Sequence, residues 1–346
     1  MALKGIIEMG AQKDTSYFAT QSTFNDAQSS FLDGAVINIT ANDTTNMSRP
    51  LFTTTRRYSL ADMTNDLYNL NARNSLGWGR VRHNFARLQL SNADVPIDWF
   101  GNNLSTWIEN VAVVGRLASE AGMKGVWLDT ESYDNKIWTY SNQAQKNSYS
   151  FRQYQEQVKQ TARIIVEKIR TFDKSLSIMT TFSYEYFADQ DPTTLETNEI
   201  GLYGSFLDGL HDEWGEQDSR TGRSSSGKII LTTEAAYGLY DTPNLSNILS
   251  MVDGTKATRY RGGSVYFGTV NEYGLANWID KPSFDPNTPG SNYFTPANFE
   301  AALQYMISNC DWLWIYQANY LFFGGTSPGS EYINKLKTLR ANNNLY

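Results

Sequence analysis

The sequence contains very little cysteine and histidine. Cys310 is its single cysteine, and His83 and His211 are its two histidines. One cysteine cannot form a disulfide within the chain, and it excludes a zinc site built from several cysteines. Two histidines argue against a metal centre built from several imidazoles. We therefore expect neither a metal nor another cofactor.

Long apolar runs and an excess of positive charge are also missing. No stretch approaches the roughly 20 consecutive apolar residues that a membrane helix needs, so we expect no membrane partner. The formal net charge is -7 at pH 7, whereas a nucleic-acid site needs clustered Lys and Arg to neutralise phosphates. Nucleic acid is therefore not an expected partner, and the sequence leaves the oligomeric state open.

The first residues, 1–4, lead directly into an apolar segment, without a signal peptide. The cellular location stays open on this pattern. A secreted or periplasmic protein is the expectation if an export signal has been removed from the chain.

Aromatic residues, in contrast, are abundant. They make up 14% of the chain, with Trp 9, Tyr 21 and Phe 17, which exceeds the needs of one core. Rings beyond those needs often line ligand sites, and the C–H faces of sugars stack on them. An acidic, aromatic-rich protein of this kind is suited to a neutral polymer such as a polysaccharide, although a tyrosine-rich fold is the simpler explanation.

Short apolar segments alternate with amphipathic helical segments along the whole chain. Candidate strands lie at 4–12, 33–39, 84–90, 124–133, 176–182, 206–213, 228–237, 262–270 and 312–316, and candidate helices at 59–70, 98–120, 150–172, 296–310 and 330–340. Strands separated by helices favour parallel β-α-β units, and about eight units make a (β/α)₈ barrel. We predict one α/β domain, a TIM barrel over 1–346. A doubly wound open sheet is the alternative, but 9–12 lacks its glycine-rich phosphate turn.

Two glutamates follow predicted strands. Asp129 and Glu131 end the fourth strand and share one of its faces, since side chains two residues apart point the same way. Glu234 ends 228–237, the predicted seventh strand, on the opposite side of the barrel mouth. Active sites of such barrels lie at the C-terminal strand ends. Glycoside hydrolysis needs two carboxyl groups there, about 5–5.5 Å apart for retention and about 6.5–9.5 Å apart for inversion.

Other side chains are candidates for binding substrate. Asp129 either orients Glu131 or accepts backbone hydrogen bonds, and Trp314 and Tyr316 either form a platform for a sugar or pack under helices. The full set of predicted binding residues is Asn38, Asp129, Tyr133, Asp208, His211, Glu213, Tyr237, Trp278, Trp314 and Tyr316. Each also has a structural explanation, because a glutamate at a strand end is often salt-bridged and a lone histidine is usually structural.

The segments KGIIEMGAQ, DGAVINI, NFARLQL, GVWLDTESY, SFLDG, TTEAAY and DWLWIYQ together resemble a group of bacterial TIM-barrel proteins that look like glycoside hydrolases. In that group Asp-x-Glu-x-Tyr follows strand four and Glu-x-x-Tyr follows strand seven. The resemblance implies that Glu131 and Glu234 are the carboxylate pair, with Tyr133, Tyr237 and Asp208 close by.

Two better-known families share parts of this pattern. Residues 129–131 are similar to the end of the strand-four motif of chitinase-like family 18 enzymes, but Trp127 stands where that motif has its earlier Asp. The large retaining clan with glutamates after strands four and seven has Asn before the strand-four Glu, and Thr130 stands there instead.

The sequence therefore predicts a glycoside hydrolase acting on a polysaccharide or oligosaccharide, with a retaining outcome favoured. Glu131 is the predicted acid/base, and Glu234 the nucleophile or base. A non-catalytic carbohydrate-binding protein, such as a phage or surface adhesin, is the alternative. A metal-dependent lyase or hydrolase using Asp129, Glu131 and Asp208 is a third hypothesis.

Overall fold

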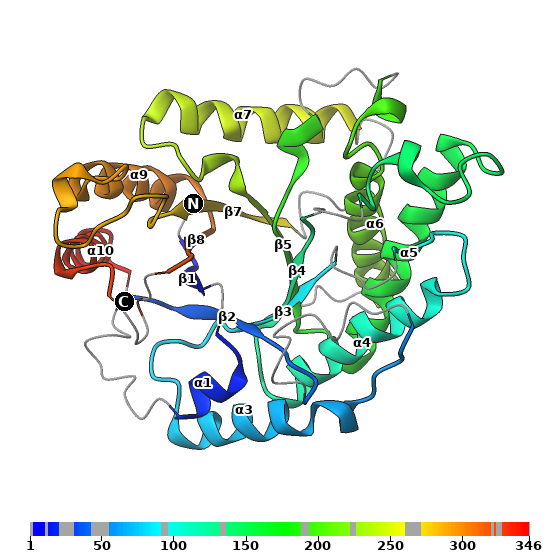
Figure 1. Cartoon of the computed structure of the whole chain (residues 1–346), viewed down its shortest axis with the longest axis horizontal. Coiled ribbons are helices and arrows are strands. Elements are labelled where there is room, and N and C mark those ends of the chain that lie inside the picture. The colour runs from blue at the N-terminus through cyan, green and yellow to red at the C-terminus, as the bar shows by residue number, and fades with distance from the viewer. Residues whose placement is uncertain are drawn as a thin grey trace.

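A computed structural model describes residues 3–10, 13–20, 31–42, 55–90, 96–131, 136–187, 194–221, 226–259, 271–319, 322 and 327–345. Within these residues, eight strands form a closed barrel in the order of the chain (Figure 1). The strands are β1 (Gly5–Gly10), β2 (Gly34–Asn38), β3 (Phe85–Gln89), β4 (Gly125–Asp129), β5 (Ser177–Thr180), β6 (Ile229–Thr233), β7 (Asn271–Trp278) and β8 (Trp312–Gln317). Every neighbouring pair is parallel, including β8 with β1.

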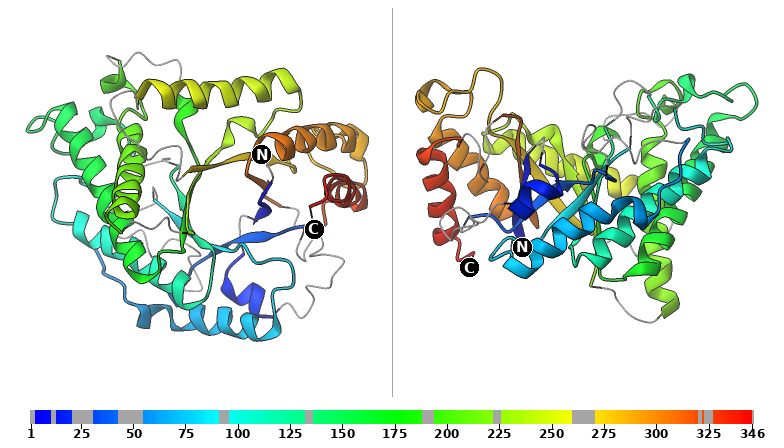
Figure 2. Two further views of the ribbon diagram at one scale, coloured as in Figure 1. Left: turned by 180° about the vertical axis from the view of Figure 1, so that it is seen from behind. Right: turned by 60° about the horizontal axis from the view of Figure 1, so that its bottom comes forward.

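Helices surround this barrel, as both views in Figure 2 show. They are α1 (Thr15–Thr20), α3 (Thr64–Leu76), α4 (Leu104–Glu120), α5 (Phe151–Phe172), α6 (Tyr203–Thr221), α7 (Thr242–Arg259), α9 (Pro296–Asn309) and α10 (Ser330–Asn342). Short 3₁₀ helices are η2 (Leu60–Met63), η3 (Tyr140–Asn142), η4 (Tyr184–Phe187), η5 (Leu195–Thr197), η6 (Glu234–Ala236) and η8 (Pro289–Ser291). The predicted (β/α)₈ fold is confirmed. No helix in the described part of the chain is both long enough and apolar enough to cross a membrane.

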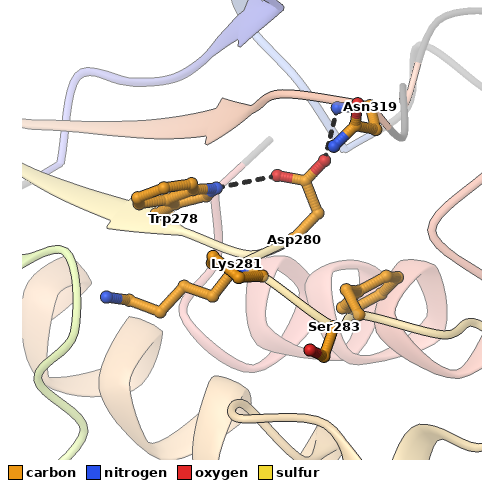
Figure 3. Close-up of a pocket in the computed structure, with 7 residues that line it drawn as sticks. Trp278, Asp280, Lys281, Ser283 and Asn319 are labelled. Atoms are coloured by element: carbon orange, nitrogen blue, oxygen red, sulfur yellow. Dashed lines mark hydrogen bonds between the residues drawn. The ribbon is translucent and has the colours of Figure 1, made fainter.

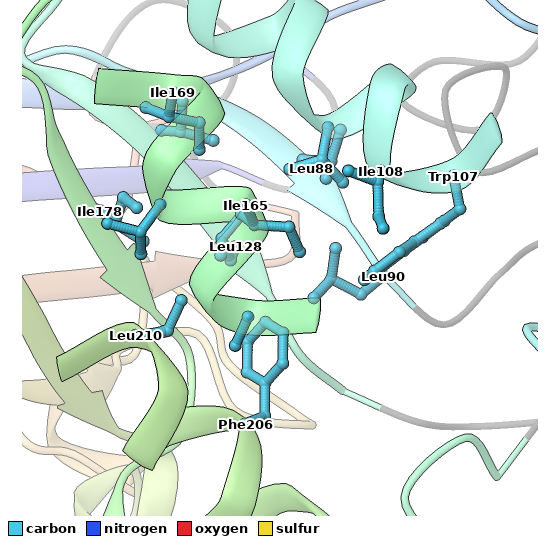
Figure 4. Packing of buried hydrophobic residues seen from close by; sticks show 14 of the residues in the cluster. Leu88, Leu90, Trp107, Ile108, Leu128, Ile165, Ile169, Ile178, Phe206 and Leu210 are labelled. Atoms are coloured by element: carbon cyan, nitrogen blue, oxygen red, sulfur yellow. The ribbon is translucent and has the colours of Figure 1, made fainter. Parts of the chain in front are cut away.

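The outer core lies between the strands and the helices. Leu88, Leu128 and Ile178 point outward from β3, β4 and β5, and they belong to the same buried cluster as Ile165 of α5 and Leu210 of α6 (Figure 4). Both faces of these strands are therefore covered, which is why they read as continuous apolar runs. Helix α5 begins where the Ser150 side chain accepts a hydrogen bond from the Gln153 backbone N–H, a capping box that the sequence allows.

Large rings fill the inside of the barrel. Trp312 occupies space that two glycines leave open. A Cβ on Gly5 would lie 2.9 Å from the Trp312 ring, and one on Gly274 would lie 3.3 Å from Trp312 Cβ. The indole N–H of Trp312 donates to Glu272 Oε2 at 2.6 Å, and Lys4 Nζ lies 2.5 Å from Glu272 Oε1. These contacts lie at the N-terminal end of the barrel, opposite the strand ends where active sites of such barrels lie.

One predicted strand is wrong. Residues 206–213 lie inside α6, and not in a sixth strand. The buried Phe206, Leu207, Leu210 and Trp214 have helical spacing, although a short apolar run of this kind also fits a buried strand. The predicted seventh strand, 228–237, therefore contains β6. The predicted segment 262–270 lies outside the described residues, and β7 follows it.

This renumbering corrects the expected position of Glu234. It follows β6, and only β5 separates β6 from β4 in the barrel. Glu131 and Glu234 therefore do not face each other from opposite sides of the barrel mouth. They extend from the ends of strands two positions apart, which lets their side chains come into contact.

Candidate active site

The carboxyl groups of Glu131 and Glu234 share a hydrogen bond at the C-terminal end of the barrel. Glu131 follows β4, and Glu234 is the first residue of η6, directly after β6. The Thr233 hydroxyl accepts a hydrogen bond of 3.0 Å from the Ala235 backbone N–H and so starts this turn. The turn brings Glu234 and Tyr237, three residues apart, to the same side.

Glu234 has an unusual electrostatic environment. Burial raises the pKa of Glu234 to about 9, and the negative charges of Glu131 and Asp129 act in the same direction. A hydrogen bond of 2.7 Å from the Tyr237 hydroxyl to Glu234 Oε1 opposes this rise but does not cancel it. Burial and the neighbouring negative charges therefore favour the protonated form of Glu234, from which a proton can pass to a ligand.

Asp129 is fully buried and holds an arginine in place. Its Oδ2 accepts hydrogen bonds from Arg87 Nη2 at 2.5 Å and from Nε at 3.1 Å. Its Oδ1 accepts from the backbone N–H of Glu131 at 3.3 Å. Burial lowers the pKa of the Arg87 guanidinium, but the charge and hydrogen bonds of Asp129 outweigh that effect and leave it raised. Asp129 thus links Arg87 of β3 to the backbone that carries Glu131.

Strand alternation explains this assembly. Phe85 and Trp127 point into the barrel, so Arg87 and Asp129, two residues further along, point inward one layer above them. Asn38 ends β2 beside Arg87, whose Nη1 lies 3.4 Å from Asn38 Oδ1. The structure therefore places Asn38 beside Arg87 and Asp129, and Asp129 in turn contacts the backbone of Glu131.

Aromatic rings form one wall of the site. Tyr237 stacks on Tyr316 with ring centroids 5.8 Å apart, and it meets Trp278 edge-on with ring centroids 5.9 Å apart. Trp314 is fully buried and contacts Tyr237 from the barrel interior, with ring centroids 5.3 Å apart. Its ring also meets Trp127 edge-on at 4.8 Å. Trp314 is thus the floor beneath the rings, while Tyr237, Trp278 and Tyr316 are half-buried and reach the mouth.

Three other predicted binding residues lie elsewhere, on helix α6. Asp208 accepts a hydrogen bond of 3.0 Å from Tyr184, and the fully buried His211 contacts the Leu207 carbonyl through Nδ1 at 2.7 Å. Glu213 lies 3.1 Å from Arg163 and 2.7 Å from Arg220. The structure does not bring these three together with Glu131 and Glu234. Tyr133 lies outside the described residues.

The sequence reasoning missed two residues that follow β5. Glu185 is fully enclosed, so burial raises its pKa, and the Ser183 hydroxyl donates a hydrogen bond to it. Within the described ranges, its other oxygen, Oε1, has no hydrogen-bond partner. Burial also raises the pKa of Tyr186, with contributions from Glu185, Glu234 and Glu131, which places this phenol near the pair. The acidic and aromatic run directly after a predicted strand was the available signal.

Arg87 was also missed, although it interrupts the apolar run of a predicted strand. Such a charge is costly to bury unless it is paired, so its presence there indicates a buried acidic partner. Among the described residues, no group of three or more His, Cys, Asp or Glu side chains could hold a metal ion.

A hollow of about 230 Å³ lies beside Trp278 and is lined by Trp278, Asp280, Lys281, Pro282, Ser283, Phe284 and Asn319 (Figure 3). Asp280 organises it. Its carboxylate accepts hydrogen bonds from Trp278 Nε1 at 3.0 Å and from the backbone N–H groups of Ala318 at 2.9 Å and Asn319 at 2.6 Å. The segment after β7 is thereby tied to the segment after β8.

No family model matches the sequence, and no curated protein matches it either. Among solved structures, the chain is similar to PbGH5A, a glycoside hydrolase family 5 enzyme from Prevotella bryantii B14. The TM-score is 0.52 and the identity 7%, over 96% of this chain and 95% of that one. A mutant of the same enzyme, in complex with a xyloglucan tetradecasaccharide, also gives a TM-score of 0.52 at 7% identity, over 97% and 96%.

An endocellulase from the archaeon Pyrococcus horikoshii is more distant, with a TM-score of 0.44 and 12% identity over 98% of this chain and 92% of that one. At these identities the similarity is one of fold. The chain shares the closed (β/α)₈ barrel with a glycoside hydrolase family 5 enzyme.

Proposed function

We propose that this protein is a retaining glycoside hydrolase acting on a polysaccharide or oligosaccharide. The hydrogen-bonded pair of Glu131 and Glu234, at the open end of the barrel, is the observation that carries this proposal. Two carboxyl groups that differ in protonation are what glycosidic cleavage requires, one as proton donor and one as anion. The likeness in fold to a family 5 enzyme supports the same reaction class.

The closeness of the two carboxyl groups favours retention. An inverting enzyme holds a water molecule between one carboxylate and the sugar, which needs a gap of about 6.5–9.5 Å. Two carboxyl groups that interact directly favour the shorter spacing of retaining enzymes over that wider gap. A covalent route, in which one carboxylate attacks the sugar itself, fits this spacing.

The sequence assigns Glu131 as acid/base and Glu234 as nucleophile or base. The electrostatics of the free site favour the reverse order. Burial keeps Glu234 protonated near neutral pH, while Arg87 attracts the negative charge of Glu131. We therefore assign the proton donor to Glu234 and the nucleophile to Glu131.

In the first step, a Glu131 oxygen forms a bond to the anomeric carbon while the bond from that carbon to the leaving oxygen breaks. Glu234 gives its proton to the leaving oxygen. In the second step, ionised Glu234 takes a proton from water, and the water oxygen displaces Glu131 from the sugar. The rings of Tyr237, Tyr316 and Trp278 would hold the sugars along one side.

The test is to measure new reducing ends after incubation with a panel of polysaccharides. Glu131→Gln and Glu234→Gln should each fold normally and lose most of the activity. Glu156→Gln, which changes an exposed carboxylate on α5, is the matched control and should keep it. Full activity in either active-site variant would refute the assignment. Glycan binding by the unaltered protein without new reducing ends would favour the non-catalytic binding protein instead.

A further inference from the structure

A lysine ammonium group lies between two aromatic rings beside the candidate active site. Lys281 Nζ is 5.2 Å from the centroid of the Trp278 ring and 5.0 Å from that of Tyr293. Figure 3 shows the Lys281 side chain extended along Trp278, with the ammonium group directed away from Ser283. Faces of aromatic rings attract cations, so the two rings hold this charge at a defined position.

The chain provides space for this arrangement at Gly238. A Cβ at that position would lie 3.1 Å from Lys281 Nζ and 3.3 Å from the Tyr293 hydroxyl. The hydroxyl donates a hydrogen bond of 2.7 Å to the Gly238 carbonyl. The segment after β6 is thus fastened to the segment after β7 at the place where the ammonium group lies.

Among the described residues, no carboxylate forms an ion pair with Lys281. In that part of the chain, the contacts of Lys281 are with rings. The adjacent Asp280 carboxylate is directed to Trp278 Nε1 and to two backbone N–H groups. Lys281 therefore presents a local positive charge on a protein whose net charge is -7.

Rings connect this charge to the glutamate pair. Glu234 accepts a hydrogen bond from Tyr237, whose ring centroid lies 5.9 Å from that of Trp278. The Trp278 ring in turn contacts the ammonium group of Lys281. On the other side of Lys281, the ring centroids of Tyr293 and Tyr240 are 6.2 Å apart. Tyr293 is 52% exposed and Tyr240 43% exposed. We call Tyr237, Trp278, Tyr293 and Tyr240 the aromatic path. Neighbouring rings that are half-buried at Tyr237 and Trp278 and exposed at Tyr293 and Tyr240 suit a chain of sugars, and Lys281 lies beside them.

We propose that Lys281 binds an anionic sugar residue, one bearing a carboxylate or a sulfate ester, in a sugar chain that lies along the aromatic path. The substrate is then an acidic polysaccharide, in contrast to the neutral polymer that the net charge favours. An ammonium group and an anion form a charge-assisted hydrogen bond, which neutral sugars do not match. This inference rests on the carbohydrate site described under Proposed function.

Affinity electrophoresis of the full chain tests the inference. The Glu131→Gln variant, which leaves the polymer intact, is run in gels that contain polygalacturonate, alginate, glucuronoxylan or carrageenan, each beside its carboxyl-reduced or desulfated form. At least one acidic polymer should bind more tightly than its neutral form. Adding Lys281→Gln should weaken that binding about tenfold or more, whereas Lys281→Arg should keep most of it.

Lys174→Gln is the matched control, because it removes one exposed positive charge at the opposite end of the barrel, between α5 and β5, and should leave binding unchanged. The comparison of the carboxylate-bearing polymers with the sulfated carrageenan identifies which anion is bound. The inference is overturned if no acidic polymer is preferred, or if Lys281→Gln keeps the preference. Hydrolysis of neutral glycans only would overturn it while the hydrolase proposal stands. If binding of an acidic polymer depends on Lys281 but the unaltered protein cleaves no glycan, the Lys281 inference stands and the hydrolase proposal fails.

Discussion

The Tyr237 hydroxyl donates a hydrogen bond of 2.7 Å to Glu234 Oε1, the carboxyl group whose pKa burial raises to about 9. This bond favours the ionised form of Glu234, against the effects of burial and of Glu131. The phenol therefore prepares Glu234 for the state that follows proton donation, in which it must act as a base.

Tyr237→Phe should lower kcat about 10- to 100-fold, because a hydrogen bond to a charged group is worth about 1.5–3 kcal/mol. It should also move the alkaline limb of the kcat/KM profile to higher pH, since the pKa of Glu234 rises when the bond is lost. A pH profile of both enzymes checks this. A lower rate with an unmoved alkaline limb would mean that Tyr237 acts through substrate binding alone. Tyr68→Phe, at an exposed ring on α3, is the control.

The order of roles at the glutamate pair can be tested with azide and a substrate that has a good leaving group. Glu131→Ala should be rescued by azide to a glycosyl azide of inverted anomeric configuration, because azide enters where the nucleophile stood. Glu234→Ala should give the retained configuration, because azide then replaces water in the second step. NMR of the products distinguishes the two. The opposite pair of outcomes would restore the order that the sequence assigns.

The buried proton of Glu234 links stability to pH. Glu234 has a folded-state pKa of about 9, above the ordinary value of 4.5, so the folded protein holds more protons than the unfolded chain between these values. Its contribution to the free energy of unfolding is present below pH 4.5 and is lost as pH rises toward 9. Glu234→Gln, which removes this titration, should therefore gain stability relative to the unaltered protein as pH increases from 5 to 9.

Thermal melts of the two proteins across that range provide the measurement. For Glu156→Gln, at an exposed site, the difference in melting temperature from the unaltered protein should vary little with pH. A difference in melting temperature between Glu234→Gln and the unaltered protein that stays constant with pH would contradict the raised pKa of Glu234.

Asp129→Asn should destabilise the fold by about 3–5 kcal/mol, because it leaves the guanidinium of Arg87 buried without its counter-charge. The double variant Asp129→Asn with Arg87→Met should lose less than the sum of the two single changes. Urea unfolding of all four proteins completes this cycle. Additive losses would show that the two side chains do not depend on each other.

Gly274→Ala should destabilise the barrel by about 1–3 kcal/mol. Its Cβ would lie 2.9 Å from Thr232 Cγ2 and 3.3 Å from Trp312, in an interior without free space. Gly290→Ala is the matched control, since a Cβ there meets no atom within 4 Å, and it should change stability by about 0.5 kcal/mol or less. Equal effects in urea unfolding would contradict the tight packing around Trp312.

Several elements could be predicted because their patterns are local. The apolar run before Asp129 and the capping residues of α5 fix β4 and that helix with few alternatives. Residues 206–213 were assigned wrongly because a short apolar run fits a strand as well as a buried helix until packing against α5 decides. That error also displaced Glu234 by one strand.

The site was harder to predict than the fold. The contact between Glu131 and Glu234 depends on how strands two positions apart bring their ends together, which no local pattern records. The ion pair of Arg87 with Asp129 joins residues 42 positions apart in the chain. The separation of Asp208, His211 and Glu213 from the pair follows from the helix that carries them.

Strand β1 pairs with β8 along its whole length, from Gly5 beside Trp312 to Gly10 beside Gln317. During synthesis on the ribosome, the ring of strands therefore stays open until nearly the entire chain has emerged. Until then β1 is a free sheet edge, and the interior rings around Trp127 lack the indoles of β8. A nascent chain stopped before residue 312 would thus be a target for chaperones or for aggregation, and not a smaller version of the folded protein.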